Sequence, residues 1–412
     1  MRFDLHYGAG LLPLEIQERT SYSVAQPMTI DTISDIDRKF LNAIENPVGV
    51  DSFSHVVSEA KSVTVVVNSD ADFDLTTMLL NKLLNSIHSS ISGPTEVVVL
   101  TTNDIEEPEE DHNRINYRII HHDAHSNEEL DFVGETPTHC TPVYINSAFL
   151  NADLKIGIGT IRSNICVGAT GGRMSAIPYS ASIKSITRNS KLQTTHPVGP
   201  FQTESATSID LTEASQLAGL DFIINAIPDW KDNIHEMVAG NPFSSWIHGV
   251  SVARGLTESF YTHKADIAIV SAGGATYDRT LFDAVDALHA GKEATEHGGV
   301  IVLIAECADG VGSDGFMRGV SECSSHEEVA LLAETNFENG MEKSRFFWEV
   351  LNSRKIIICS RLRPSLIAER FHCSAVKDPQ EGYELARSLI VSSPRVAIIP
   401  HGPRTLPIMK NS

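Results

Sequence analysis

The sequence predicts an α/β protein of two domains, each with a mainly parallel sheet and with a cleft between them. The chain has 412 residues, more than one compact hydrophobic core usually accommodates. Hydrophobic residues make up 42% of it, which is enough for two sizeable cores. Short β-branched runs alternate with amphipathic segments, a pattern typical of βα units whose strands pair in parallel.

Eight apolar runs are the clearest predicted strands. Near-continuous apolar runs of this kind are typical of strands covered by helices on both faces. They are residues 62–70, 95–103, 152–159 and 220–227, followed by 265–274, 298–306, 354–360 and 394–402. A polar stretch separates the two groups of four. We place the boundary there, which gives an N-terminal domain of residues 1–255 and a C-terminal domain of residues 256–412.

The segments between these strands are predicted from periodicity and turn residues. Apolar residues at helical spacing predict helices over residues 75–87 and 280–291, and the second helix ends at a glycine. Tyr-Gly-Ala-Gly at residues 7–10 lies between two apolar segments and predicts antiparallel strands at the start of the chain. The acidic, proline-containing residues 103–114 predict a surface loop.

The formal net charge of −21 limits the possible partners. A surface of that sign repels nucleic acid and anionic membranes, and an anionic substrate would need a locally positive pocket. The six cysteines form no C-x-x-C pair, so reduced thiols are expected. The sequence has no signal peptide and no apolar run of the ~20 residues that span a bilayer. We therefore expect a soluble, cytoplasmic protein with a small-molecule ligand, and its oligomeric state is left open.

Ligands of doubly wound folds bind beyond the C-terminal ends of the parallel strands. The most informative of these loops is GATGGRMS at residues 168–175. Its glycines allow backbone N–H groups to approach an anion, and its arginine supplies a fork for phosphate. The candidate phosphate-binding residues are Gly168, Gly171, Gly172, Arg173 and Ser175. A tight connection that needs positive φ angles is the structural alternative. The spacing fits neither a P-loop nor a dinucleotide fingerprint.

Other strand-end loops give weaker signals. Gly273 and Gly274 form a second candidate cofactor-binding turn, after which Asp278 is expected to cap a helix. The loop at residues 306–316 lacks the glutamate that would end a calcium loop. The neighbouring histidines His121, His122 and His125 favour a surface loop over a metal site.

Taken in order along the chain, these segments resemble the nickel-dependent lactate racemase family, whose members racemise or epimerise 2-hydroxy acids. The resemblance covers nearly the whole chain. It rests on YGAG, NPVGVDSF at residues 46–53, VYINSAFLNADLKIGIG, GATGGRMSAIP, DFIINAI, SAGGATYDRTLFDAVDAL, HGGVIVLIAECADGVGSDGF and AIIPHG. The resemblance implies a nickel pincer nucleotide whose phosphate lies on the glycine-rich segment, and histidines that act as general acid and base while a hydride is transferred.

The sequence departs from the family where that chemistry needs particular atoms. The lysine that can tether the cofactor is Met174, one catalytic histidine is Asn164, and the nickel-binding histidine aligns with Ser190. A thioether cannot form the tether, and an amide does not exchange a proton near neutral pH. His196 is several residues off register as a replacement nickel ligand.

Further departures affect the substrate positions that the resemblance implies. The family's D-x-T-R keeps Asp70, but its arginine falls at Phe73. The loop that holds the second acid–base histidine is rebuilt into the acidic residues 103–110. A tyrosine and a lysine of the second domain align with Phe282 and Asp286, and the lysine change replaces a cation suited to a substrate carboxylate by an anion.

Three functions are compatible with these residues. The sequence favours a diverged family member without racemase activity that binds a nucleotide or small anionic ligand in the cleft. The alternative is a racemase or epimerase of a different 2-hydroxy acid that uses an untethered nickel pincer nucleotide. A nicotinamide-dependent oxidoreductase is disfavoured because no dinucleotide fingerprint is present. No cofactor follows from the sequence, and the departures argue against the nickel nucleotide.

Overall fold

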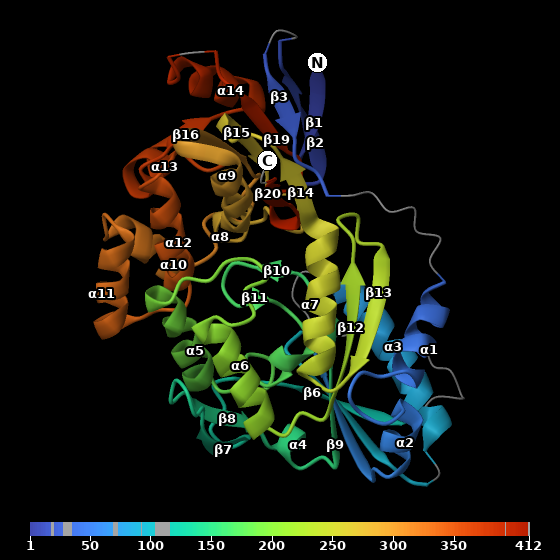
Figure 1. Ribbon diagram of the computed structural model, residues 1–412. Helices are drawn as coiled ribbons and strands as arrows, with labels where there is room; N and C mark the ends of the chain where they lie inside the picture. Colours follow the sequence, from blue (N-terminus) through green and yellow to red (C-terminus); the bar gives the residue numbers. More distant parts are fainter. Residues whose placement is uncertain are drawn as a thin grey trace.

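The computed structural model describes residues 1–17, 20–27, 35–68, 73–91, 93–103, 116–391 and 393–410. Within these residues two six-stranded sheets form the centres of the two halves of the molecule, and helices lie on both faces of each (Figure 1). The predicted fold class, α/β with two mainly parallel sheets, is confirmed.

The first sheet has the strand order β13-β12-β9-β4-β5-β6. All neighbours are parallel except β13, which runs antiparallel to β12. The strands are β4 (Ser62–Val67), β5 (Glu96–Thr101), β6 (Tyr117–His121), β9 (Leu154–Thr160), β12 (Phe222–Pro228) and β13 (Ile234–Gly240). All four strands predicted in this half are present, and the two edge strands were not predicted.

Helices cover both faces of this sheet because its strands are apolar on both sides. Val65 packs with α1, α2 and α3, whereas the next residue, Val66, packs on the opposite face, which α4, α6 and α7 cover. The predicted helix over residues 75–87 is confirmed as α3. These helices are α1 (Ile36–Glu45), α2 (Phe53–Ser58), α3 (Phe73–Ser90), α4 (Ser147–Leu150), α5 (Ile183–Thr195), α6 (Ala206–Leu217) and α7 (Ser244–Thr257).

The second sheet has the order β18-β17-β16-β15-β19-β3, and all of its neighbours are parallel. The four strands predicted in this half are again present. The strands are β3 (Tyr22–Val24), β15 (Ala265–Ser271), β16 (Thr295–Ile304), β17 (Lys355–Cys359), β18 (Ser374–Val376) and β19 (Val396–Ile399).

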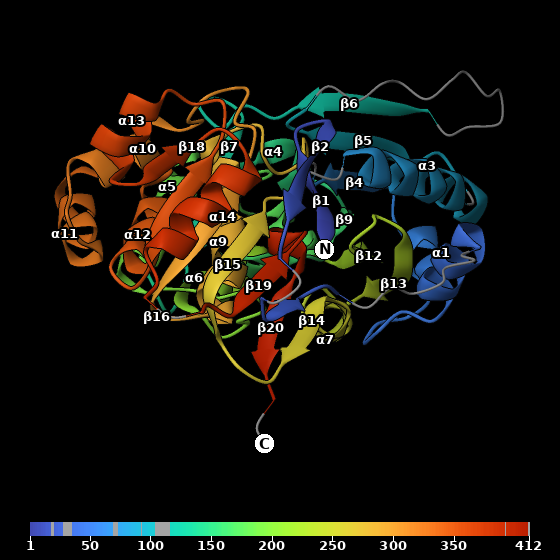
Figure 2. The same ribbon diagram turned by 90° about the horizontal axis from the view of Figure 1, so that it is seen from above.

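The start of the chain belongs with the second sheet. Strands β1 (Arg2–Tyr7) and β2 (Gly10–Glu15) form the predicted antiparallel hairpin, with Tyr7 opposite Gly10. Its buried leucines Leu5 and Leu14 pack, together with α14 (Pro379–Ser388), on one face of the second sheet (Figure 2). Strand β3 then pairs with β19 at the edge of that sheet. The sheets therefore divide the chain differently from the continuous segments 1–255 and 256–412.

The other face of the second sheet is covered by a further group of helices. Two of them, α11 and α12, contact α5 of the first half. The predicted helix over residues 280–291 is broken into α8, a 3-10 turn and α9. The elements are α8 (Leu281–Ala284), η2 (Val285–Ala287), α9 (Leu288–Ala294), α10 (Asp314–Ser321), α11 (His326–Asn336), α12 (Met341–Leu351) and α13 (Pro364–Phe371).

Separate two-stranded sheets accompany the two larger ones. Strand β14 follows α7 directly and pairs in parallel with β20 near the C-terminus. The remaining pairs and 3-10 turns are β7 (Leu130–Glu135), β8 (Pro142–Asn146), β10 (Ser163–Asn164), β11 (Gly168–Ala169), β14 (Glu258–Tyr261), β20 (Leu406–Met409), η1 (Gly172–Ser175) and η3 (Gly402–Arg404).

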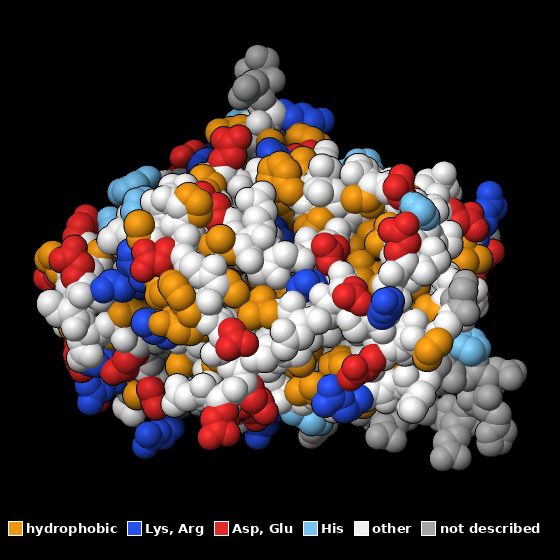
Figure 3. All heavy atoms as spheres, turned by 90° about the horizontal axis from the view of Figure 1, so that it is seen from below, with side chains coloured by type: hydrophobic (Ala, Val, Ile, Leu, Met, Phe, Trp, Pro, Cys, Tyr) orange, Lys and Arg blue, Asp and Glu red, His pale blue; other side chains and the backbone are white. Residues whose placement is uncertain are grey.

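The surface mixes side chains of all kinds. On the face shown in Figure 3, acidic, basic and apolar side chains are interspersed.

Among the described residues, no helix combines the length and the apolarity that crossing a membrane requires. The six cysteines are all free thiols, as the sequence predicts.

Candidate functional site

A cavity of about 520 Å³ lies between the two halves of the molecule. Its first-half wall lies at the C-terminal ends of β4 and β9, where parallel α/β sheets bind ligands. Its second-half wall comes from the turn after β15, from α8 and η2, and from α12 and η3. The lining residues are Asn68, Thr160, Arg162, Ser163, Asn164, Thr170, Gly171, Met174, Tyr179, Thr276, Tyr277, Phe282, Asp283, Asp286, Lys343, Pro403 and Arg404.

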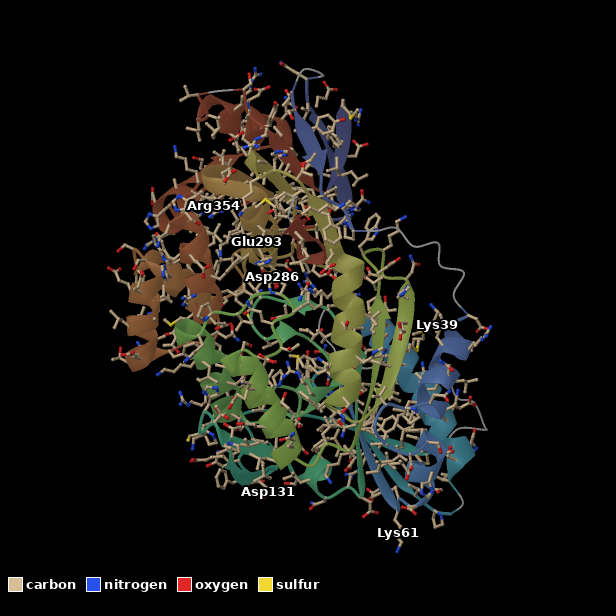
Figure 4. The ribbon with its side chains drawn as sticks, in the orientation of Figure 1. Lys39, Lys61, Asp131, Asp286, Glu293 and Arg354 are labelled. Atoms are coloured by element: carbon tan, nitrogen blue, oxygen red, sulfur yellow. The ribbon has the colours of Figure 1, made fainter. Side chains whose placement is uncertain are left out.

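The structure brings together five of the residues that the sequence singled out. Asn164, Gly171 and Met174 line the cavity from the first half, and Phe282 and Asp286 line it from the second. In Figure 4, Asp286 lies between the helices of the second half and the β10–β11 hairpin.

Three other predicted positions are not among the described residues that line the cavity. Asp70 is outside the described residues, and so is the acidic segment 104–115. Phe73 begins α3, but its side chain is not among those described. Ser190 lies in α5 and is not among the residues that line the cavity.

Asn164 has a local structural role. Its side-chain oxygen accepts hydrogen bonds from the backbone N–H groups of Cys166 (2.7 Å) and Val167 (3.0 Å). An asparagine side chain commonly closes a turn in this way. The amide therefore shapes the β10–β11 turn, and it has no group that exchanges a proton near neutral pH.

The glycine-rich segment passes through tightly packed surroundings. Gly168 has a φ of +80°, and a Cβ there would lie 2.2 Å from the carbonyl oxygen of Gln202. Gly171 has a φ of +139°, and a Cβ there would lie 2.7 Å from the Trp246 ring. The N–H of Gly172 donates to the side-chain oxygen of Asn225 at 3.1 Å. These contacts support the structural alternative, a connection that needs glycine, while Gly171 alone of the three borders the cavity.

Arg173 makes its described contacts within the protein, so its use as a phosphate fork stays a prediction. The residue is only 1% exposed, and its guanidinium donates to the carbonyl oxygen of Ser208 at 2.6 Å and to the hydroxyls of Ser208 and Thr212. It also stacks on Trp246, with the guanidinium carbon 3.7 Å from the ring centroid. Burial lowers the pKa of Arg173 to about 9. The spacing of the motif could not show that this side chain points into the core.

Ser175 is also buried. Its hydroxyl donates to the side-chain oxygen of Asn68 at 3.0 Å, and the amide of Asn68 donates to the carbonyl oxygen of Gly171 at 3.1 Å. The serine therefore fixes the cavity wall through Asn68, which itself faces the cavity. A phosphate contact of Ser175 remains a prediction that this geometry does not favour.

The second glycine turn contacts the N-terminal hairpin. The carbonyl oxygen of Gly8 accepts from the N–H of Ala275, next to Gly274, and lies 3.0 Å from where a Cβ of Gly274 would be. Gly273 lies beside His401 and Tyr277. Neither glycine is among the residues that line the cavity, so cofactor binding by this turn remains a prediction.

Asp278 does not cap the helix as predicted, because Thr280 caps α8 instead. The Asp278 carboxylate accepts from the N–H of Gly8 at 2.8 Å and from the N–H of Glu306 at 3.1 Å. It therefore holds the N-terminal hairpin against the end of β16. A contact across 270 positions of sequence could not be inferred from spacing.

Two arginines of the cavity wall meet at one carboxylate. Arg162 and Arg404 donate to the same oxygen of Asp232, at 2.7 and 2.6 Å. Arg404 comes from the second half of the molecule and Asp232 from the β12–β13 turn of the first, so this ion pair joins the halves. Arg404 also contacts the hydroxyl of Tyr277 and donates to the carbonyl oxygen of Asp229.

Lys343 is a further cation in the cavity wall. Its Nζ lies 2.6 Å from Oδ1 of Asp286, donates to the carbonyl oxygen of Phe282 at 3.0 Å, and lies 4.3 Å from the centroid of the Phe282 ring. Burial is the largest single effect on the pKa of Lys343 and lowers it, but the nearby charges, led by that of Asp286, and the hydrogen bond to Asp286 together raise it more, so the net shift is upward. No motif indicates this lysine, and it becomes visible only when α12 packs beside η2.

An aromatic contact also joins the halves. His401 lies 4.7 Å from Trp230 of the first half and 4.8 Å from His6 of the N-terminal hairpin, between ring centroids. Burial, together with the nearby His6 and Arg404, lowers the pKa of His401 to about 4.

We expect the protein to lose stability as the pH falls from about 6.5 to about 4. In this range His401 stays neutral in the folded chain but takes up a proton in the unfolded chain, whose histidine pKa is about 6.5. Because His401 is only partly buried, we expect a contribution of about 1–2 kcal/mol. Urea unfolding of His401→Gln should show a flatter pH dependence over this range. The exposed His263→Gln is the control, and an unchanged slope in His401→Gln would refute this assignment.

The histidines do not assemble a metal site in the described part of the chain. No group of three or more histidine, cysteine, aspartate or glutamate side chains there could hold a metal ion. His122 is buried and its Nε2 lies 2.9 Å from the carbonyl oxygen of Ala181. His196 lies at the end of α5, where its Nδ1 is 2.9 Å from the hydroxyl of Thr195, and it does not line the cavity.

Comparisons with known proteins agree along the chain. Residues 7–199 match the family model of the lactate racemase N-terminal domain, and residues 260–406 match that of the lactate racemase C-terminal domain. The chain is 24% identical to the lactate racemase of Thermoanaerobacterium thermosaccharolyticum over 375 residues, covering 87% of this chain and 88% of the relative. It is also 24% identical to the lactate racemase of Lactiplantibacillus plantarum over 376 residues, with the same coverage.

Two solved structures share the fold. The lactate racemase apoprotein from T. thermosaccharolyticum matches with a TM-score of 0.84 and 22% identity, covering 99% of this chain and 100% of its own. A protein from Thermotoga maritima matches with a TM-score of 0.60 and 13% identity, covering 93% and 99%.

Proposed function

The chain belongs to the lactate racemase family, and we propose that it binds a small anionic molecule in the cavity between its halves without carrying out the racemase reaction. The observation that supports this best is the set of residues in the cavity wall. Among the described residues that line it, none is a histidine, and Asn164, Met174 and Asp286 stand where the family resemblance implies reactive groups. The described part of this wall therefore lacks the pair of histidines that the family resemblance implies as general acid and base.

The nickel pincer nucleotide does not fit these residues. Met174 presents a thioether where an amine would form the tether, and Ser190 is a poor ligand for a soft nickel site. The side-chain oxygen of Asn164 is already bonded to the turn at residues 166–167. We therefore derive no reaction step through that cofactor.

The charge of the cavity wall supports an anionic ligand. Its described lining contains Arg162, Arg404 and Lys343 against Asp283 and Asp286. With Asp232, which both arginines contact, the formal charge here is +3 − 3 = 0. The chain as a whole carries −21. Field lines converge in a cavity with low-dielectric walls, so three cationic side chains in a wall without net charge can attract an anion that the acidic outer surface repels.

A binding experiment tests this proposal. Isothermal titration calorimetry of the full chain with L-lactate, D-lactate, inorganic phosphate and adenosine monophosphate should give saturable binding of at least one of them. The variant Arg404→Met should weaken that binding by about tenfold, because a charged hydrogen-bond donor of the wall is lost. The exposed Arg118→Met is the matched control. Absence of binding by all four compounds would contradict an anion-binding cavity.

A further inference from the structure

The wall of the second half carries a cation at an unexpected position. The resemblance implies a lysine on the helix at residue 286, where this chain has an aspartate. Lys343 reaches the same place from α12, and its Nζ lies 2.6 Å from Oδ1 of Asp286. Both side chains line the cavity. Lys343 therefore supplies a positive charge next to residue 286, where the resemblance implies a lysine.

The surroundings of Lys343 favour a negative partner. It lies in the first turn of α12, where the helix dipole already attracts negative charge. Its side chain is only 10% exposed, so its ammonium group needs a charged or strongly polar partner at all times. The nearby Cys166 is no such partner, because burial raises the pKa of its thiol well above the ordinary value.

Asp286 is the more exposed partner of this contact. Its side chain is 25% exposed, more than that of Lys343, and it lies in the 3-10 turn η2 that interrupts the helix between α8 and α9. Short 3-10 segments inside helices often mark positions that move. A carboxylate that turns into solvent regains its hydration, whereas the buried ammonium group cannot.

We propose that Lys343 binds the anionic group of a cavity ligand, and that Asp286 is an internal counter-ion which this group replaces. The inference rests on the proposed function and names the residue that selects the ligand. The ligand group is a carboxylate or a phosphate that accepts from Lys343 Nζ beside the Phe282 carbonyl. Asp286 then acts as a competitor that sets the affinity.

Three variants test the exchange by calorimetry with L-lactate, inorganic phosphate and adenosine monophosphate. Asp286→Asn removes the competitor and should tighten binding by at least about threefold, although loss of a buried ion pair destabilises the fold. Lys343→Met should weaken binding by about tenfold. The double variant Lys343→Met with Asp286→Asn leaves no unpaired charge, so it should fold and still bind weakly. The three ligands distinguish a carboxylate site from a phosphate site.

A second ion pair on the same helix provides the control. Lys292 is paired with Glu349 of α12, and neither residue lines the cavity. The double variant Lys292→Met with Glu349→Gln should leave ligand affinity unchanged.

The outcomes separate the two proposals. If wild-type protein and Asp286→Asn both fail to bind any of the three ligands, the anion-binding function is wrong, and the role of Lys343 with it. If wild-type protein binds a ligand, and Lys343→Met and the double variant bind it as tightly as wild-type protein does, only the proposed role of Lys343 is wrong. Equal or weaker binding by Asp286→Asn overturns the exchange of counter-ions.

Discussion

Replacing Arg173 by leucine is expected to lower the free energy of unfolding by about 3 kcal/mol. The side chain is almost fully buried, and its guanidinium donates to the Ser208 carbonyl and to two hydroxyls while it stacks on Trp246. Leucine leaves these acceptors without the donor that they have in the folded protein, and the Ser208 acceptors are buried. Urea unfolding monitored by circular dichroism measures the change.

Arg118→Leu is the control for this variant. Arg118 pairs with Glu96 on the surface, where both side chains are more than half exposed, so its loss should change stability by less than about 1 kcal/mol. If Arg173→Leu retains full stability but no longer binds phosphate compounds, the arginine is a phosphate ligand after all. Its assignment to the core would then be wrong.

Replacing Asp278 by alanine should release the N-terminal hairpin and cost about 2–4 kcal/mol of stability. Its carboxylate accepts from the N–H groups of Gly8 and Glu306, and the residue is 1% exposed. Without it the buried N–H of Gly8 and the partly buried N–H of Glu306 lose their acceptor. Hydrogen exchange measured by mass spectrometry should show faster exchange in β1 and β2, in addition to a lower unfolding midpoint.

Asp278→Asn is the matched variant, because its amide oxygen can accept the same two hydrogen bonds. We expect it to keep most of the protection of the hairpin. Slow exchange of residues 2–15 in Asp278→Ala would show that the leucine contacts alone hold the hairpin, and would contradict a structural role for this carboxylate.

The parts of the fold that follow from local pattern were predictable. Eight apolar runs gave the eight central strands, and Tyr7–Gly10 gave the opening hairpin. Strand β3 was not predictable, because three residues carry little pattern and its partner β19 lies more than 370 positions away. The edge strands β6 and β13 are less apolar than the central ones. A strand at the edge of a sheet needs fewer consecutive apolar residues than a central strand, so its sequence pattern is weaker.

The candidate site was predictable only where a resemblance marks the residues. Asn164, Met174, Phe282 and Asp286 were indicated in this way, and all four line the cavity. Lys343 carries no motif, so tertiary packing alone brings it to the cavity. For Arg173, the sequence motif gives the residue type but cannot show the direction of its side chain. The 3-10 turn at Asp286 was likewise hidden within a regular helical pattern.

The nickel content and racemase activity of the full chain test the central claim most directly. The protein would be purified from cells that make the nickel pincer nucleotide, beside the lactate racemase of T. thermosaccharolyticum as a positive control. Metal analysis, visible absorbance, and the interconversion of L- and D-lactate and of other 2-hydroxy acids would be measured on both. We predict substoichiometric nickel, no cofactor absorbance and no racemisation by this chain. One nickel per chain together with inversion of any 2-hydroxy acid would contradict the account.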